Sequence, residues 1–401
     1  MIEFLISLLN IGAIPEIYSY TAFAVFVVFF YQRVKVGKIN LNALACPIIW
    51  LQVLMGFFFS LHYPHISTNS FFVCVVLYCF VPLLVFVSGF QLLRISSANS
   101  QEAFLDVLYS IIVGCAIHCL LNIIVNLGND RWHLVDFFVG NRSATNSGAL
   151  NTFVFSFFPA ILLEKRIKYK VVGMICLFIS LVYAFILGTR TQIYMLIIVC
   201  FISLMLNLLT QTKKTIDLKL LGAIFAVFLM SISGVTLALV YNLGGIKDKI
   251  LNSNLLYRYA DVETAGSDSY RSNLVIKGLI GLWNYPFGEN REVTYFHNYW
   301  LDVGRVGGII PFALAVLITV IMLIHVVRLF SNVRIRPVVR YAIIGVFLGV
   351  SLNYLMEPIM DGFFHLINRY ILYTGMIEAL YAQYGFETNG VAYENSMDLQ
   401  H

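Results

Sequence analysis

The polar residues that could do chemistry are concentrated in one stretch, TYFHNYWLDVGRVGGII, at residues 294–310. Within it, His297 and Asn298 lie between aromatic residues of the kind that settle at a membrane interface. A histidine that is near water yet partly desolvated can take a proton from an incoming hydroxyl at neutral pH. The pattern therefore indicates either a general base, His297, or an aromatic belt with an incidental histidine.

Arginines form a second group of candidates, because four of them lie on the predicted outer face, where membrane orientation does not call for positive charge. These are Arg142, Arg190, Arg271 and Arg305. A guanidinium stays charged and binds phosphate oxygens in a forked geometry, so several converging arginines would suit a diphosphate. For any one of them alone, snorkelling to the interface or pairing with a nearby aspartate is the more common role.

Two carboxylates, Glu357 and Asp361, lie in the segment MEPIMDGFFH at the predicted outer end of a span. Paired carboxylates could orient a sugar or a histidine. A helix-terminating turn at Pro358 and Gly362 accounts for them almost as well. Both interpretations stay open at the level of sequence.

The remaining histidines and motifs favour no other chemistry. His62 and His65 have no cysteine or carboxylate beside them, so an interfacial loop is expected there and no metal site. His118 falls inside a predicted span, where a buried, hydrogen-bonded histidine is expected. The sequence has no nucleophile elbow, P-loop, dinucleotide fingerprint or HExxH motif, which excludes the common ATP-driven and hydrolytic classes. We expect neither a metal nor a cofactor.

The elements that must position these residues are membrane helices. Of the 401 residues 60% are hydrophobic and only 12% charged, and the mean hydropathy is +0.83. Such a chain is an all-α polytopic membrane protein, expected to form a single transmembrane domain over residues 1–401. The seven cysteines fall in apolar segments without a disulfide or CxxC pattern, and no basic run is long enough to bind nucleic acid.

Apolar runs of about 20 residues predict about eleven transmembrane helices, within a range of about ten to twelve. They lie near residues 15–32, 41–61, 70–93, 104–127, 148–163, 171–187, 191–210, 218–240, 301–327, 338–357 and 367–385. Lys and Arg collect in alternate loops, among them residues 165–170 and 328–340, which the positive-inside rule makes cytoplasmic. All the candidate chemistry then lies on the outer face.

The longest outer loop is expected at residues 241–300. Leu274, Val275, Leu279 and Leu282 recur there at helical spacing. The loop is too small and too polar to form a separate domain, so we expect it to lie as a lid over the membrane bundle.

Several motifs in a fixed order resemble those of the O-antigen polymerase and O-antigen ligase superfamily. They are GNRSATNSGA, LGTRTQIYMLII, NYPFGEN and FHNYWLDVGRVGGIIPF, and they span roughly residues 130–380. The resemblance implies a GT-C-like architecture with one large periplasmic loop. It also implies that His297 activates the acceptor hydroxyl while Arg190 and Arg271 hold the diphosphate. Arg142 and Arg305 receive no family role, and Gly288 stands alone where the family often has two glycines.

The function that the resemblance implies is polymerisation of O-antigen or capsule repeat units at the outer face of a bacterial inner membrane. Donor and acceptor would both be undecaprenyl-diphosphate-linked oligosaccharides within the bilayer, joined by an inverting, metal-independent glycosyl transfer. A chain-length regulator protein is a further expected partner. An O-antigen ligase that transfers glycan to the lipid A core is the nearest alternative, and a flippase or transporter of lipid-linked glycan is an alternative from another class.

Overall fold

A computed structural model describes residues 41–95, 99–127, 134–138, 140, 148–149, 151–210, 262–357, 359–362 and 364–385. The predicted spans at 15–32 and 218–240 lie outside these residues, as does Arg142. Throughout the described part the named elements are helices, and a single isolated bridge joins Asp136 and Gly140.

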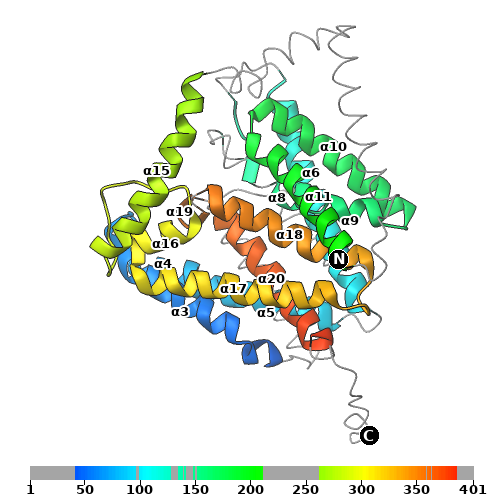
Figure 1. The fold of residues 1–401 in the computed structure, drawn as a ribbon, viewed down its shortest axis with the longest axis horizontal. Helices are drawn as coiled ribbons and strands as arrows, with labels where there is room; N and C mark the ends of the chain where they lie inside the picture. Colours follow the sequence, from blue (N-terminus) through cyan, green and yellow to red (C-terminus); the bar gives the residue numbers. More distant parts are fainter. Residues whose placement is uncertain are drawn as a thin grey trace, which may run out of the picture.

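Figure 1 shows the described helices in their order along the chain, coloured from blue to red. They are η1 (Leu41–Ala45), α3 (Pro47–His62), η2 (Tyr63–His65), α4 (Phe71–Val75), η3 (Val76–Phe80), α5 (Val81–Ile95), α6 (Ser100–Val125), α8 (Thr152–Ser156), α9 (Phe158–Leu163), α10 (Ile167–Leu187), α11 (Arg190–Thr210), α15 (Val262–Asn284), α16 (Tyr299–Gly307), α17 (Ile309–Ser331), α18 (Pro337–Met356), α19 (Ile359–Gly362) and α20 (Phe364–Tyr384).

Six helical segments of the described chain are long and apolar enough to cross a membrane, which makes this a multi-pass membrane protein. They are Pro47–His65, Phe71–Leu93, α6, α10, α17 and α18. The shorter apolar part of α11, Thr191–Leu206, and the more polar α20 fall outside that group. The total of about eleven spans stays a prediction.

Two of the expected spans differ from the prediction because the helix is broken. The run at 148–163 forms two short helices, α8 and α9, that meet at Phe157 and are almost wholly buried. The run at 301–327 is divided at Gly308 into α16 and α17. Interrupted helices are tolerated at membrane depth only where protein surrounds the freed backbone groups. Hydropathy alone does not distinguish such buried segments from lipid-facing ones.

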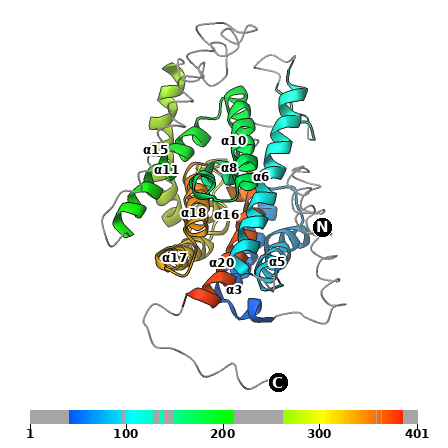
Figure 2. The ribbon, with the colours of Figure 1, turned by 90° about the vertical axis from the view of Figure 1, so that its right-hand side faces the viewer.

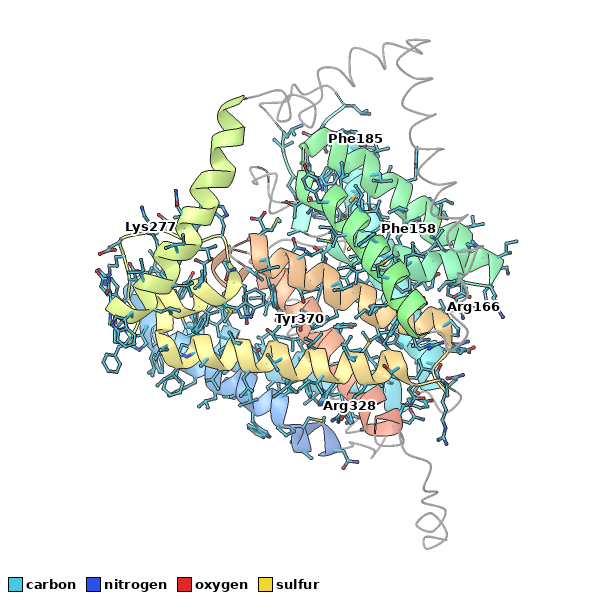
Figure 3. The ribbon with its side chains drawn as sticks, viewed as in Figure 1. Phe158, Arg166, Phe185, Lys277, Arg328 and Tyr370 are labelled. Carbon is cyan, nitrogen blue, oxygen red and sulfur yellow. The ribbon has the colours of Figure 1, made fainter. Side chains whose placement is uncertain are left out.

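The loops predicted to be cytoplasmic meet at one end of the bundle. Arg336 pairs with Glu102 at 3.2 Å, and its backbone N–H donates to Gln101 at 2.9 Å. Arg166 lies 3.8 Å from Asp106. Figure 3 shows Arg166 and Arg328 on the side of the molecule away from Lys277 of α15. This grouping is what a single membrane face requires, and residues 286–300 lie toward the other end.

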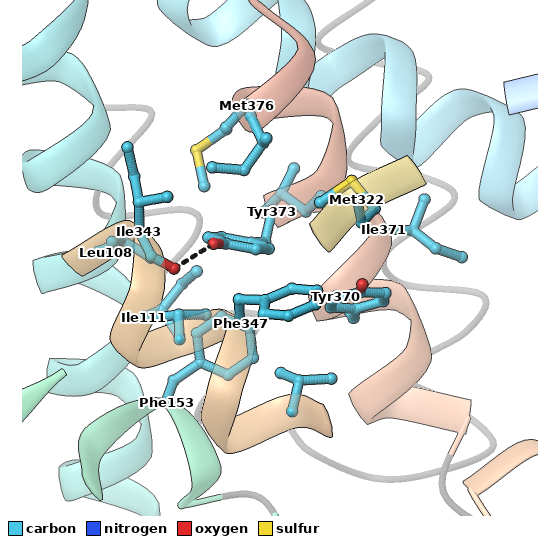
Figure 4. Close-up of a cluster of buried hydrophobic side chains, with 14 of the residues drawn as sticks. Leu108, Ile111, Phe153, Met322, Ile343, Phe347, Tyr370, Ile371, Tyr373 and Met376 are labelled. Carbon is cyan, nitrogen blue, oxygen red and sulfur yellow. Dashed lines mark hydrogen bonds between the residues drawn. The ribbon is translucent and has the colours of Figure 1, made fainter. Parts of the chain in front are cut away.

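α5 and α20 cross at close range in the core, and glycines make that approach feasible. A Cβ on Gly89 would lie 2.2 Å from the carbonyl oxygen of Leu372, and one on Gly375 would lie 2.2 Å from that of Phe86. Small residues allow such close backbone contact between membrane helices. Nearby, Tyr373 donates a 2.5 Å hydrogen bond to the carbonyl oxygen of Ile343, so α20 is also tied to α18 (Figure 4).

The Gly375→Leu substitution is therefore expected to destabilise the bundle, since its side chain meets the backbone of α5 and not a movable side chain. Overpacking of this kind costs about 1–3 kcal/mol, or more where the obstacle is backbone. Thermal unfolding in detergent, followed by circular dichroism, should show a lower midpoint. Ala382→Leu, at an exposed position of the same helix, is the matched control and should leave the midpoint unchanged. Equal midpoints for the two variants would contradict the packing argument.

Candidate functional site

The site begins where the chain is broken between α16 and α17. Gly308 has φ +88° and Gly288 has φ +89°, and the two backbones cross in contact. A Cβ on Gly288 would lie 2.2 Å from the Val306 carbonyl oxygen, and one on Gly308 would lie 2.2 Å from that of Pro286. Both the positive φ and the lack of space require glycine at these positions. The NYPFGEN and GRVGG motifs are thus two halves of one structural unit.

Backbone hydrogen bonds join this loop to the end of α16. The N–H groups of Glu289 and Asn290 donate to the carbonyl oxygens of Val306 and Arg305, each at 3.0 Å. The N–H of Ile309 donates to the Pro286 carbonyl oxygen at 2.9 Å. Carbonyl groups that the end of a helix leaves without partners are therefore satisfied by the loop.

His297 precedes α16 in an uncommon backbone conformation, with φ +54°. Its side chain is 23% exposed, and the ring of Tyr295 lies edge-on to it at 4.6 Å. Its Nδ1 is 3.9 Å from Oε2 of Glu357, and within the described chain this Nδ1 makes no hydrogen bond. A partly exposed imidazole thus faces a carboxylate whose residue is 2% exposed.

Asp302 holds the backbone on both sides of His297. The Phe296 N–H donates to its Oδ1 at 2.6 Å, and the Asn298 N–H donates to its Oδ2 at 3.2 Å. Asn298 in turn caps α16, because its side chain accepts the Leu301 N–H at 3.1 Å. The hydrogen bonds of Phe296 and Asn298 to Asp302 therefore hold the backbone of His297 in its conformation.

Arg305 and Asn298 have structural places in this arrangement. Arg305 is buried one turn after Asp302, with Nε 3.8 Å from Asp302 Oδ1. For Arg305 alone, the sequence allowed snorkelling to the interface or pairing with an aspartate, and the contact with Asp302 favours the ion pair. Asn298, expected beside the base, serves as the helix cap.

The structure places Glu357 both at the end of a helix and beside His297. α18 ends at Met356, the Glu357 N–H donates to the Asn353 carbonyl oxygen at 2.9 Å, and the side chain reaches His297. Tyr299 of α16 and Tyr354 of α18, two and three residues from His297 and Glu357 in the sequence, stack with their ring centroids 4.1 Å apart.

The other predicted site residues are placed by their backbones only. Arg190 is the first residue of α11 and follows Gly188, whose φ of +72° ends α10 in a tight turn. Arg271 lies within α15, and Asp361 lies within α19, which contacts α16. The side chains of these three residues lie outside what the structure describes.

Of the two expectations about the other histidines, the one for His118 is confirmed and the loop expected at His62 and His65 is wrong. His118 is fully buried against Asp136 at 3.1 Å and also contacts Asn122. His62 is the last residue of α3 and His65 the last of η2, and the Nδ1 of His62 is 3.2 Å from Oε1 of Glu289, a carboxylate distant in sequence. Among the residues described, no three potential ligands are grouped to hold a metal ion.

Beside Glu289, the exposed Tyr285 hydroxyl donates to the Glu292 carboxylate at 2.7 Å. That hydrogen bond raises the pKa of Tyr285, since the phenol must stay protonated to donate. This hydrogen bond lies on the exposed side of the loop before His297, whose position is held by the contacts of Gly288, Glu289 and Asn290 with the end of α16.

No protein-family model matches the sequence, and no curated protein is significantly similar to it. The resemblance described above therefore depends on the motifs and on their order.

The contacts of Asp302 predict that Asp302→Asn loosens the backbone at His297. An amide offers one acceptor oxygen to two N–H donors, and a buried unsatisfied donor costs about 1–3 kcal/mol. Hydrogen exchange at the Phe296 and Asn298 amides should accelerate while overall helicity is kept. Glu292→Gln, an exposed change in the same loop, is the control and should leave both amides protected. Unchanged exchange in Asp302→Asn would show that the carboxylate does not hold this segment.

Proposed function

We propose that this protein is a membrane glycosyltransferase that polymerises polyprenyl-diphosphate-linked oligosaccharide repeat units of an O-antigen or capsule. The reaction would take place at the outer face of a bacterial inner membrane. The observation that carries the proposal is His297, a partly exposed imidazole in an uncommon backbone conformation whose Nδ1 faces the buried Glu357 carboxylate. Strained backbone at a polar site that other residues hold in place is a frequent feature of functional sites.

The arrangement suits a histidine that accepts a proton. With Nδ1 directed at Glu357, the other ring nitrogen, Nε2, is left to accept the proton of an acceptor hydroxyl. The buried Glu357 carboxylate, 3.9 Å from Nδ1, faces the imidazolium that forms when the ring takes the proton. Glu357 therefore acts as the residue that orients and stabilises His297.

The proposed step is a single displacement at the anomeric carbon of the donor. The acceptor oxygen forms the new glycosidic bond as its proton passes to His297, and the bond to undecaprenyl diphosphate breaks. The diphosphate is a good leaving group, so the protein needs to supply a base, cationic stabilisation and alignment of two lipid-anchored substrates. Arg190 and Arg271 are proposed to bind the diphosphate, in keeping with the motifs that contain them.

A transporter of lipid-linked glycan is the second candidate, because ionisable residues lie inside the bundle. His325 of α17 is 2.5 Å from Glu378 of α20, and Arg369 of α20 is also buried. Ionisable groups within membrane helices often mark transport pathways. Purified protein in liposomes with labelled lipid-linked oligosaccharide separates the two: lengthening of the glycan supports the polymerase, and movement across the bilayer without lengthening supports the transporter.

His297→Ala is expected to lower polymerisation about 10²–10⁴-fold, the usual contribution of a general base. The measurement is a gel of surface polysaccharide from cells that lack the gene and carry a plasmid copy. Wild type should restore a ladder on the lipid A core, and His297→Ala should leave a single repeat unit. His65→Ala, an exposed histidine elsewhere on the same side, is the control and should restore the ladder.

Two outcomes of that gel would contradict the proposal in different ways. A full ladder from His297→Ala would remove the histidine from the reaction. Bare core in the deletion strain, with long glycan accumulating on the lipid carrier, would identify a ligase.

Arg190→Lys should also shorten or abolish the ladder, since a point charge does not replace the forked contact of a guanidinium with a diphosphate. The protein should still be present in the membrane at wild-type level, which immunoblotting of membrane fractions would check. Lys277→Arg, at an exposed position of α15, is a charge-conserving control. Wild-type ladders from Arg190→Lys would rule out a diphosphate-binding role for this arginine.

A further inference from the structure

The C-terminal half of α15 has two apolar faces. One face packs on the bundle: Leu274 and Leu282 are buried, and Leu282 touches Gly304 of α16. The second face is exposed and consists of large hydrophobic side chains at positions i, i+3, i+4 and i+7 of the helix. These residues, here called the α15 stripe, are Ile276, Leu279, Ile280 and Trp283.

Exposure of the α15 stripe is high for side chains of this type. Trp283 is 84% exposed, and Phe287, which follows one turn later in the loop, is 79% exposed. The polar residues Asn273, Lys277 and Asn284 share the neighbouring side of the same helix. A helix with one strongly apolar side, a polar edge and a tryptophan is the type that lies in a membrane interface.

The α15 stripe is continuous with a surface that faces lipid. Phe287 lies where the two backbones cross. The Ile309 N–H donates there to the carbonyl oxygen of Pro286, the residue before Phe287. Ile309 and Ile310 begin the exposed apolar side of α17, which continues to Val327. Because α17 is long and apolar enough to span the membrane, this side of it faces acyl chains. Phe287 extends the same surface beyond the end of the span toward α15.

The direction of α15 agrees with a position along the membrane surface. In Figure 1, α17 runs across the view and α15 rises steeply from the end at which α17 begins. In Figure 2, α17 is seen end-on while α15 still runs upward. α15 therefore lies across the axis of the spanning helix, as an interfacial helix does.

We propose that the α15 stripe and Phe287 insert into the outer leaflet, at the boundary between acyl chains and headgroups. The occupant of this face is lipid. Lys277, on the polar edge, extends toward the headgroups, as long basic side chains do at this depth. Because Gly278 touches Leu301 and Leu282 touches Gly304, insertion fixes α16, and with it His297, at a set height above the bilayer. This inference does not depend on which reaction the protein catalyses.

Spin labels on single cysteines test the inference in full-length protein reconstituted into lipid nanodiscs. Cys46→Ser provides the background, because the other six cysteines are buried. Labels are placed at Ile280→Cys in the α15 stripe and at Lys277→Cys on the polar edge of the same helix. Leu317→Cys of α17 gives the reference value for a label in lipid, and Glu292→Cys of the loop gives the reference value for a label in water. All four side chains are exposed, so the substitutions should leave the fold intact.

The readout is the ratio of collision rates with oxygen, which concentrates in lipid, and with a water-soluble nickel complex. The ratio is expected to be several-fold higher at Ile280→Cys than at Lys277→Cys, and to lie between the values for Leu317→Cys and Glu292→Cys. Equal ratios at Ile280→Cys and Lys277→Cys, with access to nickel at both, would place the stripe in water and overturn the inference. A third result would be a label at Ile280→Cys that neither probe reaches until the protein is diluted into excess lipid. That result would identify a second copy of the chain as the occupant and would also overturn the inference that lipid covers the stripe.

Discussion

The structure around His297 depends on satisfying backbone groups where a helix is interrupted at the membrane surface. α16 ends at Gly307, and the carbonyl groups of Arg305 and Val306 accept N–H groups from the loop at Asn290 and Glu289. In a bilayer, such groups have no water to replace a missing partner, so the interruption requires the loop to be in place. The crossing of Gly288 and Gly308 is the geometry that brings loop and helix end together. The loop, the first turn of α17 and the backbone before His297 therefore depend on one another for their structure.

A second constraint is the balance of buried charge beside that crossing. Asp302 lies beside Arg305 and accepts two backbone N–H groups, whereas Glu357 faces the ionisable ring of His297. A buried carboxylate is costly unless it is paired or hydrogen-bonded. In the proposed reaction, proton uptake by His297 would turn a carboxylate beside a neutral ring into an ion pair. Asp302 fixes the backbone on both sides of His297, whereas Glu357 faces its ring.

Sequence reasoning identified the class of fold and the stretch that holds the site, but not the contacts that shape it. Helices α10 and α18 begin and end within a few residues of prediction, since lipid-facing or long apolar helices have a strong compositional signal. Glu357 was a candidate because it lies at the predicted outer end of a span. Its contact with His297 was not predicted, because the two residues are 60 positions apart in the sequence. The role of Asp302 was missed. Asp302 lies four residues after Asn298 and so does not form a capping box with it, and its role becomes evident only when the φ of His297 is known.

α20 (Phe364–Tyr384) lies in the middle of this bundle, and the span predicted at 367–385 matches it to within a few residues. Every residue from Leu366 to Tyr381 is buried, and the helix packs against α5, α17 and α6. A helix surrounded by protein need not be apolar, because its polar side chains find partners: Glu378 meets His325, and the Tyr381 hydroxyl accepts a hydrogen bond from Arg328. α17, whose exposed side faces lipid, is more apolar, but the span predicted at 301–327 did not show the break at Gly308. Hydropathy alone therefore does not report exposure to lipid, because α6 and α18 are apolar enough to span a membrane and yet lie mostly buried in the bundle.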